Sequence, residues 1–280
     1  MNNNTISSTN ALLEALTYDG LHINKDLEGK AWVGHTPFAY WLVAALKPKI
    51  LVELGTHGGG SYFSFCQSVK DNELSTKTYA VDTWMGEEHA GLYSESVFEK
   101  VLNFNNEYFA SFSSLMKMKF DEALNEFDDG SVDLLHIDGF HSFKAVCNDF
   151  NTWHPKLSKE AVVLFHDIHE IKPGFGVHQF WGELKNKHHD QCFEFKHSHG
   201  LGVYFPNSSK AAINFKNKLG VDLEKMFNVF SIIGDDIYYN LNGRYSLHKN
   251  FRLSIDQLVK VLKKLKTDNP ELANQLKTIL

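Results

Sequence analysis

The sequence VELGTHGGGS, from Val52 to Ser61, joins an apolar run to a segment with helical composition. The apolar run, Ile50 to Leu54, is typical of a buried strand, and residues 61–70 are typical of a helix. Glycine lets a backbone turn tightly and approach a ligand closely. Four glycines between positions 55 and 60 therefore indicate a ligand-binding loop at the end of a strand.

Outward from this loop, short apolar segments alternate with helical ones. Strands separated by helices pair in parallel through crossovers, but the last two strands are too close for a crossover and should form a hairpin. We therefore predict a Rossmann-like α/β fold, with seven mostly parallel strands, one antiparallel strand in a C-terminal hairpin, and helices on both faces. The expected strands are residues 50–54, 78–81, 115–119, 132–137, 161–165, 193–196 and 203–205, and the expected helices are 37–46, 61–70, 96–108, 121–127, 142–153 and 177–188.

The two ends of the chain depart from this alternation. We expect residues 1–30 to be a variable leader with a short helix over 11–16, residues 31–206 to be the α/β domain, and residues 207–280 to be a mostly helical extension. Leu258, Val261, Leu262 and Leu265 form a helical stripe in that extension. The stripe predicts either a helix that covers the core or a contact between copies of the chain in a homo-oligomer.

Composition narrows the class of protein. The formal charge of −6 leaves no basic excess for a phosphate backbone, which argues against nucleic acid as a partner. The three cysteines match no disulfide or zinc spacing and favour reduced thiols in the cytoplasm. The polar N-terminus predicts no secretion signal. The longest apolar run, residues 40–46, is far too short to cross a bilayer.

The glycine loop favours one class of nucleotide ligand. A helix N-terminus offers free N–H groups and a positive dipole end, which suit the carboxylate of a methionine, and Glu53 could face a positive amino or sulfonium group. The nicotinamide fingerprint needs glycine at its first, third and sixth positions. His57 holds the third position, where a side chain obstructs a pyrophosphate. S-adenosylmethionine has no pyrophosphate, so the loop favours it, with a nicotinamide oxidoreductase as the alternative.

Asp82 ends the second expected strand and can accept both ribose hydroxyls of a nucleoside. The adenine should then lie over the end of the third strand, near Lys119 and Phe120, although Phe120 would serve equally as a core residue. The predicted contacts of S-adenosylmethionine, and of its product S-adenosylhomocysteine, are Glu53, Gly55, Thr56, His57, Gly58, Ser61, Asp82, Thr83, Trp84, Lys119, Phe120, Asp138 and His141.

Two further strands end in aspartate and histidine. The fourth reads LLHIDGFH from Leu134 to His141, and the fifth reads VLFHDIHE from Val163 to Glu170. Ligands of open α/β sheets lie outside the carboxyl ends of the strands, so Asp138 and Asp167 should converge. Paired carboxylates raise each other's pKa or recruit a cation. We therefore predict that Asp138 and Asp167 bind Mg²⁺ or a similar hard divalent ion, which a histidine can also ligate.

This edge also suggests a chemistry. An alcohol is a poor nucleophile until its proton leaves; a cation lowers the pKa of the hydroxyl, and a nearby base removes the proton. The predicted catalytic residues are Asp138, with His141 as the base and His166 as the rival base, because imidazole titrates near neutrality. Either histidine could instead cap a helix or bond a backbone carbonyl.

From Trp32 to Pro206 the chain resembles the class I methyltransferases of the Methyltransf_24 group, which occur in bacterial surface-polysaccharide gene clusters. The resemblance covers more than half of the chain. The glycine loop is shared by many methyltransferases, whereas IDGxH followed by FHD is more specific. The stretches that carry it are VELGTHGGGSY (52–62), DTWMGEEHAGL (82–92), LLHIDGFHSFKAVCNDFNTW (134–153) and LFHDIHEIKPGFGVHQFW (164–181).

The resemblance implies methyl transfer from S-adenosylmethionine to a sugar hydroxyl, on a glycan or nucleotide-sugar, in polysaccharide or related glycoside biosynthesis. Related macrolide sugar O-methyltransferases hold a divalent metal with acids at these strand ends, which selects Asp138 and Asp167, with His166 where relatives often carry a second acid. The pattern also carries Asp149, which we interpret as structural.

Two questions keep alternatives open: the role of one insertion and the function of the whole chain. The insertion after Asp82 could bind the acceptor or close over the cofactor alone. Other readings of the whole chain are a noncatalytic cofactor-binding domain of a polysaccharide-assembly complex, or a methyltransferase of a non-sugar small molecule. The insertion residues concerned are Trp84, Glu87, Glu88, His89 and Tyr93.

Overall fold

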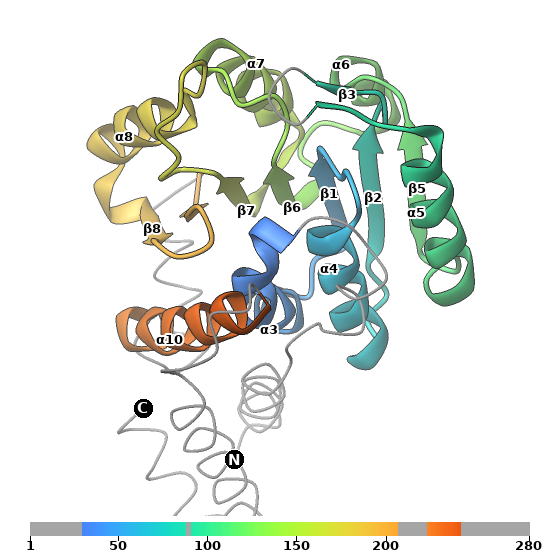
Figure 1. Ribbon diagram of the computed structural model, residues 1–280, viewed down its shortest axis with the longest axis horizontal. Helices are drawn as coiled ribbons and strands as arrows, with labels where there is room; N and C mark the ends of the chain where they lie inside the picture. The colour runs from blue at the N-terminus through green and yellow to red at the C-terminus, as the bar shows by residue number, and fades with distance from the viewer. Residues whose placement is uncertain (1–29, 88–90, 207–222, 242–280) are drawn as a thin grey trace, which may run out of the picture.

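The computed structural model describes residues 30–87, 91–206 and 223–241 of the chain (Figure 1). The helix expected at residues 11–16 and the leucine stripe at 258–265 lie outside these ranges. The homo-oligomer inferred from that stripe therefore stays a prediction.

The core of the fold is the predicted seven-stranded sheet. Its order is β5-β2-β1-β6-β7-β9-β8. All neighbouring pairs are parallel except those of β9, which runs antiparallel to both β7 and β8. This confirms the Rossmann-like sheet with one antiparallel strand. The strands are β1 (Ile50–Leu54), β2 (Lys77–Asp82), β5 (Ser113–Lys117), β6 (Val132–Ile137), β7 (Leu157–His166), β8 (Cys192–Phe195) and β9 (Leu201–Tyr204).

Helices cover both faces of the sheet (Figure 1). On one face lie α3 (Thr36–Leu46), α4 (Gly60–Asp71), α5 (Glu95–Tyr108) and α10 (Leu223–Leu241), and on the other lie α6 (Phe120–Ala123), α7 (Phe143–Trp153) and α8 (Val177–Lys187). Short 3₁₀ turns, η1 (Lys30–His35), η2 (Leu124–Glu126), η3 (His154–Lys156) and η4 (His189–Gln191), join or precede them, and a small hairpin pairs β3 (Gly86–Glu87) with β4 (Gly91–Leu92).

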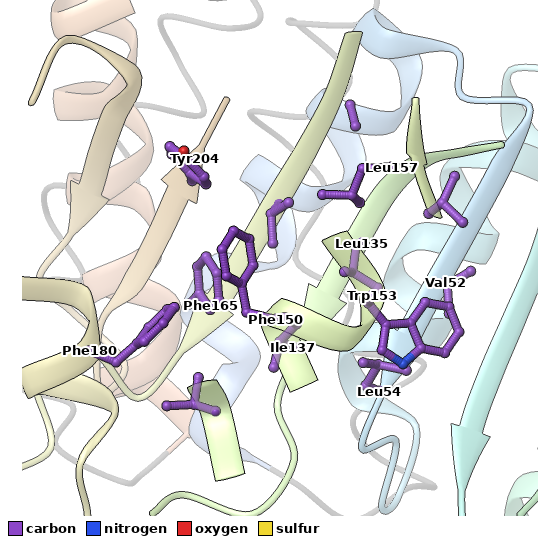
Figure 2. Packing of buried hydrophobic residues seen from close by; sticks show 14 of the residues in the cluster. Val52, Leu54, Leu135, Ile137, Phe150, Trp153, Leu157, Phe165, Phe180 and Tyr204 are labelled. Carbon is purple, nitrogen blue, oxygen red and sulfur yellow. The ribbon is translucent and has the colours of Figure 1, made fainter. Parts of the chain in front are cut away.

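The two cores follow from the alternation of side chains along each strand. In β1, Leu51 packs toward α3, α4 and α10, whereas Val52 and Leu54 pack toward α6, α7 and α8. Figure 2 shows Trp153 of α7 beside Val52 and Leu54. Because both faces are apolar, the strands read as continuous hydrophobic runs, as expected for a parallel sheet covered on both sides.

The structure shifts some expected boundaries. β5 begins and ends two residues earlier than the predicted strand 115–119. It is an edge strand with only one fully buried residue, Ser113, so its apolar pattern is weak. Lys119 consequently lies outside the strand, and its N–H donates to Glu122 Oε2 at 3.0 Å at the start of α6. The β3–β4 hairpin was not expected, because each strand has only two residues.

Part of the predicted C-terminal extension joins the main core. Phe227 and Phe230 of α10 pack against Phe38 of α3, with ring centroids 5.3 and 5.8 Å away. α10 also packs along η1. Within the described ranges, no helix has the length and apolarity needed to cross a bilayer.

The turn after β1 touches the turn after β6. The N–H of Asp138 donates to Leu54 O at 2.9 Å, and the N–H of Gly55 donates to Val81 O at 2.9 Å. Gly55 has a φ of +90°, and a Cβ there would lie 2.1 Å from the carbonyl oxygen of Asp138. Only glycine allows this approach, which brings the loop of β1 against the strand end that carries Asp138.

We expect Gly55→Ala to destabilise the protein more than Gly130→Ala. Gly130 also has a positive φ, +72°, but nothing lies within 4 Å of its Cβ position. Gly130→Ala should cost only the left-handed backbone, about 1–2 kcal/mol. Crowding against backbone should add about 1–3 kcal/mol for Gly55→Ala. Urea unfolding of the two variants measures the difference, and equal losses would contradict the close contact.

Candidate functional site

A pocket of about 310 Å³ opens at the carboxyl ends of β1, β2 and β6. Eight of the residues predicted to contact the cofactor line it: Gly55, His57, Asp82, Thr83, Lys119, Phe120, Asp138 and His141. Five others, Glu53, Thr56, Gly58, Ser61 and Trp84, are not among its lining residues. The pocket is also lined by Gly86, Tyr93, Asp121, Gly139, Phe140, Asn148 and Asp149.

Glu53 is buried beneath the loop and faces a histidine. His136 Nδ1–H donates to Glu53 Oε2 at 2.7 Å, and Trp32 Nε1–H donates to His136 Nε2 at 3.2 Å. Burial raises the pKa of the Glu53 carboxyl, and the bond from His136 offsets part of that rise. His136 stands directly beside Glu53 in the sheet. A polar residue in each of two adjacent apolar strands was the signal for this pair, which the sequence analysis missed.

Asp82 holds the glycine loop in place. Its Oδ2 accepts the N–H groups of Thr56 and His57, each at 2.9 Å, and its Oδ1 accepts the N–H of Trp84 at 2.7 Å. A carboxylate has about four acceptor positions, so one position on Oδ1 remains for a ligand hydroxyl. The geometry is therefore compatible with a contact to one ribose hydroxyl, whereas the sequence analysis expected this carboxylate to accept both.

Two aromatic residues of the insertion after Asp82 contact His57 of the glycine loop. Tyr93 lines the pocket and stacks on His57, with ring centroids 4.4 Å apart. Trp84 is buried, and its indole N–H donates to His57 O at 2.9 Å. Trp84 therefore stabilises the glycine loop without lining the pocket. Glu88, His89 and the side chain of Glu87 lie outside the part of the chain that the structure describes.

The ends of β6 and β7 bring two aspartates and two histidines together. His141 Nε2 lies 2.8 Å from Asp167 Oδ2 and 3.8 Å from Asp138 Oδ1. His166 Nδ1 lies 3.3 Å from Asp138 Oδ1 and 3.6 Å from Asp167 Oδ1. We call these four residues the Asp–His cluster. One potential ligand atom each from Asp138, His141 and Asp167 lie within 4.8 Å of one another.

The electrostatics of the Asp–His cluster favour charged imidazoles. Burial disfavours the charged form of His141, but hydrogen bonds and charges from Asp138 and Asp167 outweigh it and raise its pKa to about 10. The same balance raises the pKa of His166 to about 9. Burial works against the charge of Asp138, yet the two histidines hold its pKa well below the usual range. The cluster thus strongly attracts positive charge, whether protons or a cation.

Neighbouring groups fix both histidines. His166 Nε2–H donates to Ser198 O at 2.9 Å, which aims Nδ1 at the carboxylates. Phe175 stacks on the His141 ring at 4.7 Å, and the N–H of Gly176 donates to His141 O. Asp167 has a φ of +61°, an uncommon conformation for a residue with a side chain. No local sequence pattern indicated the role of Phe175 or the backbone conformation of Asp167.

Residues 52–168, which carry this pocket and the Asp–His cluster, match the family model Methyltransf_24, described as a methyltransferase domain. The match supports a methyltransferase domain over these residues. The matched methyltransferase domain covers less than half of the chain.

Part of the chain also has a relative in sequence. The uncharacterised protein y4gI of Sinorhizobium fredii is 50% identical over 175 residues, which are 62% of this chain and 19% of that protein. The chain therefore spans about a fifth of the length of this relative.

Solved structures with a similar arrangement are more distant. A putative caffeoyl-CoA O-methyltransferase from Staphylococcus aureus is 14% identical, with a TM-score of 0.48 over 61% of this chain and 81% of that one. The O-methyltransferase TomG from Streptomyces achromogenes, involved in tomaymycin synthesis and solved with S-adenosylmethionine, is 12% identical, with a TM-score of 0.48 over 73% of this chain and 90% of that one.

We expect the metal-free protein to lose stability at alkaline pH. The folded-state pKa of His141, about 10, and that of His166, about 9, exceed the ordinary value of 6.5. Their ion pairs therefore stabilise the fold fully below about pH 6.5, and this contribution disappears as pH rises through 9 and 10. A difference of one pKa unit between the folded and the unfolded state corresponds to about 1.4 kcal/mol of folding stability.

Denaturant unfolding with a chelator present, from pH 6 to pH 10, measures this slope. His141→Gln should flatten it, whereas His189→Gln, which removes an exposed histidine beside Asp190, should leave it unchanged. A wild-type slope equal to that of His141→Gln would contradict the assignment.

Proposed function

We propose that this chain is a cytoplasmic, S-adenosylmethionine-dependent O-methyltransferase that acts on a sugar hydroxyl, on a glycan or nucleotide-sugar, in the biosynthesis of surface polysaccharide or a related glycoside. The observation that carries the proposal is the meeting of two features at one sheet edge. A pocket bounded by Gly55 and Asp82 reaches Asp138 and His141, which belong to the Asp–His cluster.

The pocket fits the proposed cofactor. Its volume is within the range of small-ligand sites, about 300–1,000 Å³. Asp82 retains an acceptor position for a ribose hydroxyl, and Phe120 offers an apolar surface for a base. The methionine end of the cofactor would then lie toward Gly55 and Asp138. When bound, S-adenosylmethionine supplies an electrophilic methyl group.

The Asp–His cluster fits a divalent cation. Two carboxylates and an imidazole form an oxygen-rich donor set that suits Mg²⁺ or Mn²⁺. Asp138 and Asp167 have carboxylate oxygens close enough to share an ion, and His166, whose Nδ1 lies beside both carboxylates, is the proposed imidazole ligand. A cation held there would lower the pKa of an acceptor hydroxyl.

The chain's own residues then have distinct tasks. Asp138 and Asp167 concentrate positive charge where an acceptor oxygen would become negative. His141 is the candidate base, and the proton that Asp138 and Asp167 hold on its ring must leave before the ring can accept another. Phe175 keeps that ring in one plane. In-line transfer also requires the acceptor to be aligned with the methyl group, which a fixed pocket favours.

Cofactor binding and turnover should separate by mutation. Asp82→Ala should abolish binding of S-adenosylhomocysteine, because it removes the ribose acceptor and the anchor of three loop amides. Asp138→Asn and His141→Gln should keep that binding and lower turnover by about a hundredfold or more. Calorimetry and a methyl-transfer assay measure the two effects.

The matched control is Asp190→Asn, an exposed acid far along the chain, which should change neither quantity. NAD(H) should not bind the wild type. Full activity of both cluster variants on the true acceptor would show that the catalytic assignment is wrong.

The acceptor class can be tested with paired panels. We expect transfer of a labelled methyl group to hydroxyls of nucleotide-sugars or glycosides, stimulated by Mg²⁺ or Mn²⁺ and lost with a chelator. A matched panel of phenols should react poorly. Activity on phenols alone would replace the sugar with a non-sugar acceptor, and activity insensitive to the chelator would remove the metal from the mechanism.

A further inference from the structure

One end of the pocket lies against α6 and α7. Lys119, Phe120 and Asp121 line it from the start of α6, and Asn148 and Asp149 line it from α7. Lys119, Asp121 and Asn148 are exposed, whereas the Asp149 residue is only 6% exposed. We call this region the base end of the pocket. A buried carboxyl on a pocket wall is uncommon, since acids are rarely buried without a partner.

The carboxyl of Asp149 and the ring of Phe120 meet at Gly139. A Cβ added to Gly139 would lie 2.5 Å from the Phe120 ring and 3.3 Å from Asp149 Oδ2. Gly139 itself lines the pocket. A flat aromatic ligand that packs on Phe120 would therefore reach Asp149 with one edge.

The surroundings of Asp149 contain no compensating cation. Burial raises its pKa to about 7, the Asn148 amide opposes that rise, and the Asp121 carboxylate adds to it. No lysine, arginine or histidine of residues 30–87, 91–206 and 223–241 forms an ion pair with it. The other titratable groups on the pocket are His57, Asp82, Tyr93, Lys119, Asp138 and His141. Asn148 supplies one hydrogen bond to this carboxyl. Since a carboxyl has several acceptor positions in either protonation state, it can still accept a second hydrogen bond, from a ligand.

We propose that Asp149 is a specificity-determining residue, whose carboxyl accepts a hydrogen bond from the exocyclic amino group of the nucleoside base bound against Phe120. The inference rests on the proposed S-adenosylmethionine site and adds the residue that reads the identity of the base. It replaces the interpretation of Asp149 as purely structural. In this arrangement Asp82 recognises the sugar of the nucleoside, and Asp149 recognises its base.

The test couples a change in the ligand to a change in the residue. The ligands are S-adenosylhomocysteine and its purine analogue, which lacks the 6-amino group. Wild type should bind the analogue about tenfold more weakly, because one hydrogen bond to a buried acceptor is lost. Asp149→Leu should bind both ligands equally, and Asp149→Asn should keep the preference, because its amide oxygen still accepts.

Asp121→Asn, at the exposed mouth of the same end, is the matched control and should keep the wild-type preference. Equal binding of both ligands by wild type, or an undiminished preference in a folded Asp149→Leu, would overturn the role of Asp149. Should Asp149→Leu fail to fold by circular dichroism, the wild-type comparison and Asp149→Asn still decide. Absence of any S-adenosylhomocysteine binding by wild type would instead overturn the proposed function.

Discussion

The contact between the ends of β1 and β6 underlies the whole site. The Asp138 N–H bonds Leu54 O, and Gly55 approaches the Asp138 carbonyl so closely that no side chain fits between them. This contact brings the glycine loop, which belongs to the first crossover, against the strand end that carries the acid. Without it, the pocket bounded by Asp82 and the Asp–His cluster would be separate features of the same sheet edge.

The Asp–His cluster shows how a strand end becomes reactive. Two carboxylates at adjacent strand ends would repel each other in isolation, and the structure balances them with two imidazoles that retain their protons well above neutrality. Ser198 and Phe175 orient the rings, and both residues come from loops outside β6 and β7. The ends of β6 and β7 therefore bring the charged groups together, and contacts from other loops orient the two imidazole rings.

Strong, locally encoded patterns allowed much of this architecture to be predicted. The strand Val132–Ile137 was predicted to the residue, because four of its six residues are apolar and polar residues bound it. The predicted range of the edge strand β5 was two residues too late, because its exposed side chains weaken its apolar pattern. Asp138 and Asp167 were predicted to converge, because parallel strands end at one edge, and His141 and His166 were predicted to act beside them. The pairing of Glu53 with His136 joins segments 83 residues apart, and the burial of Asp149 depends on how α7 packs against Gly139 and Phe120. No local pattern encodes either contact.

The three amides that Asp82 holds have a consequence for how a ligand would enter. Thr56, His57 and Trp84 are tied to one carboxylate within the protein itself. The loop is thus ordered by folding, and its conformational entropy is already lost before association begins. A nucleoside would meet a rigid receptor, so its residence time, more than any rearrangement of the loop, would set the affinity.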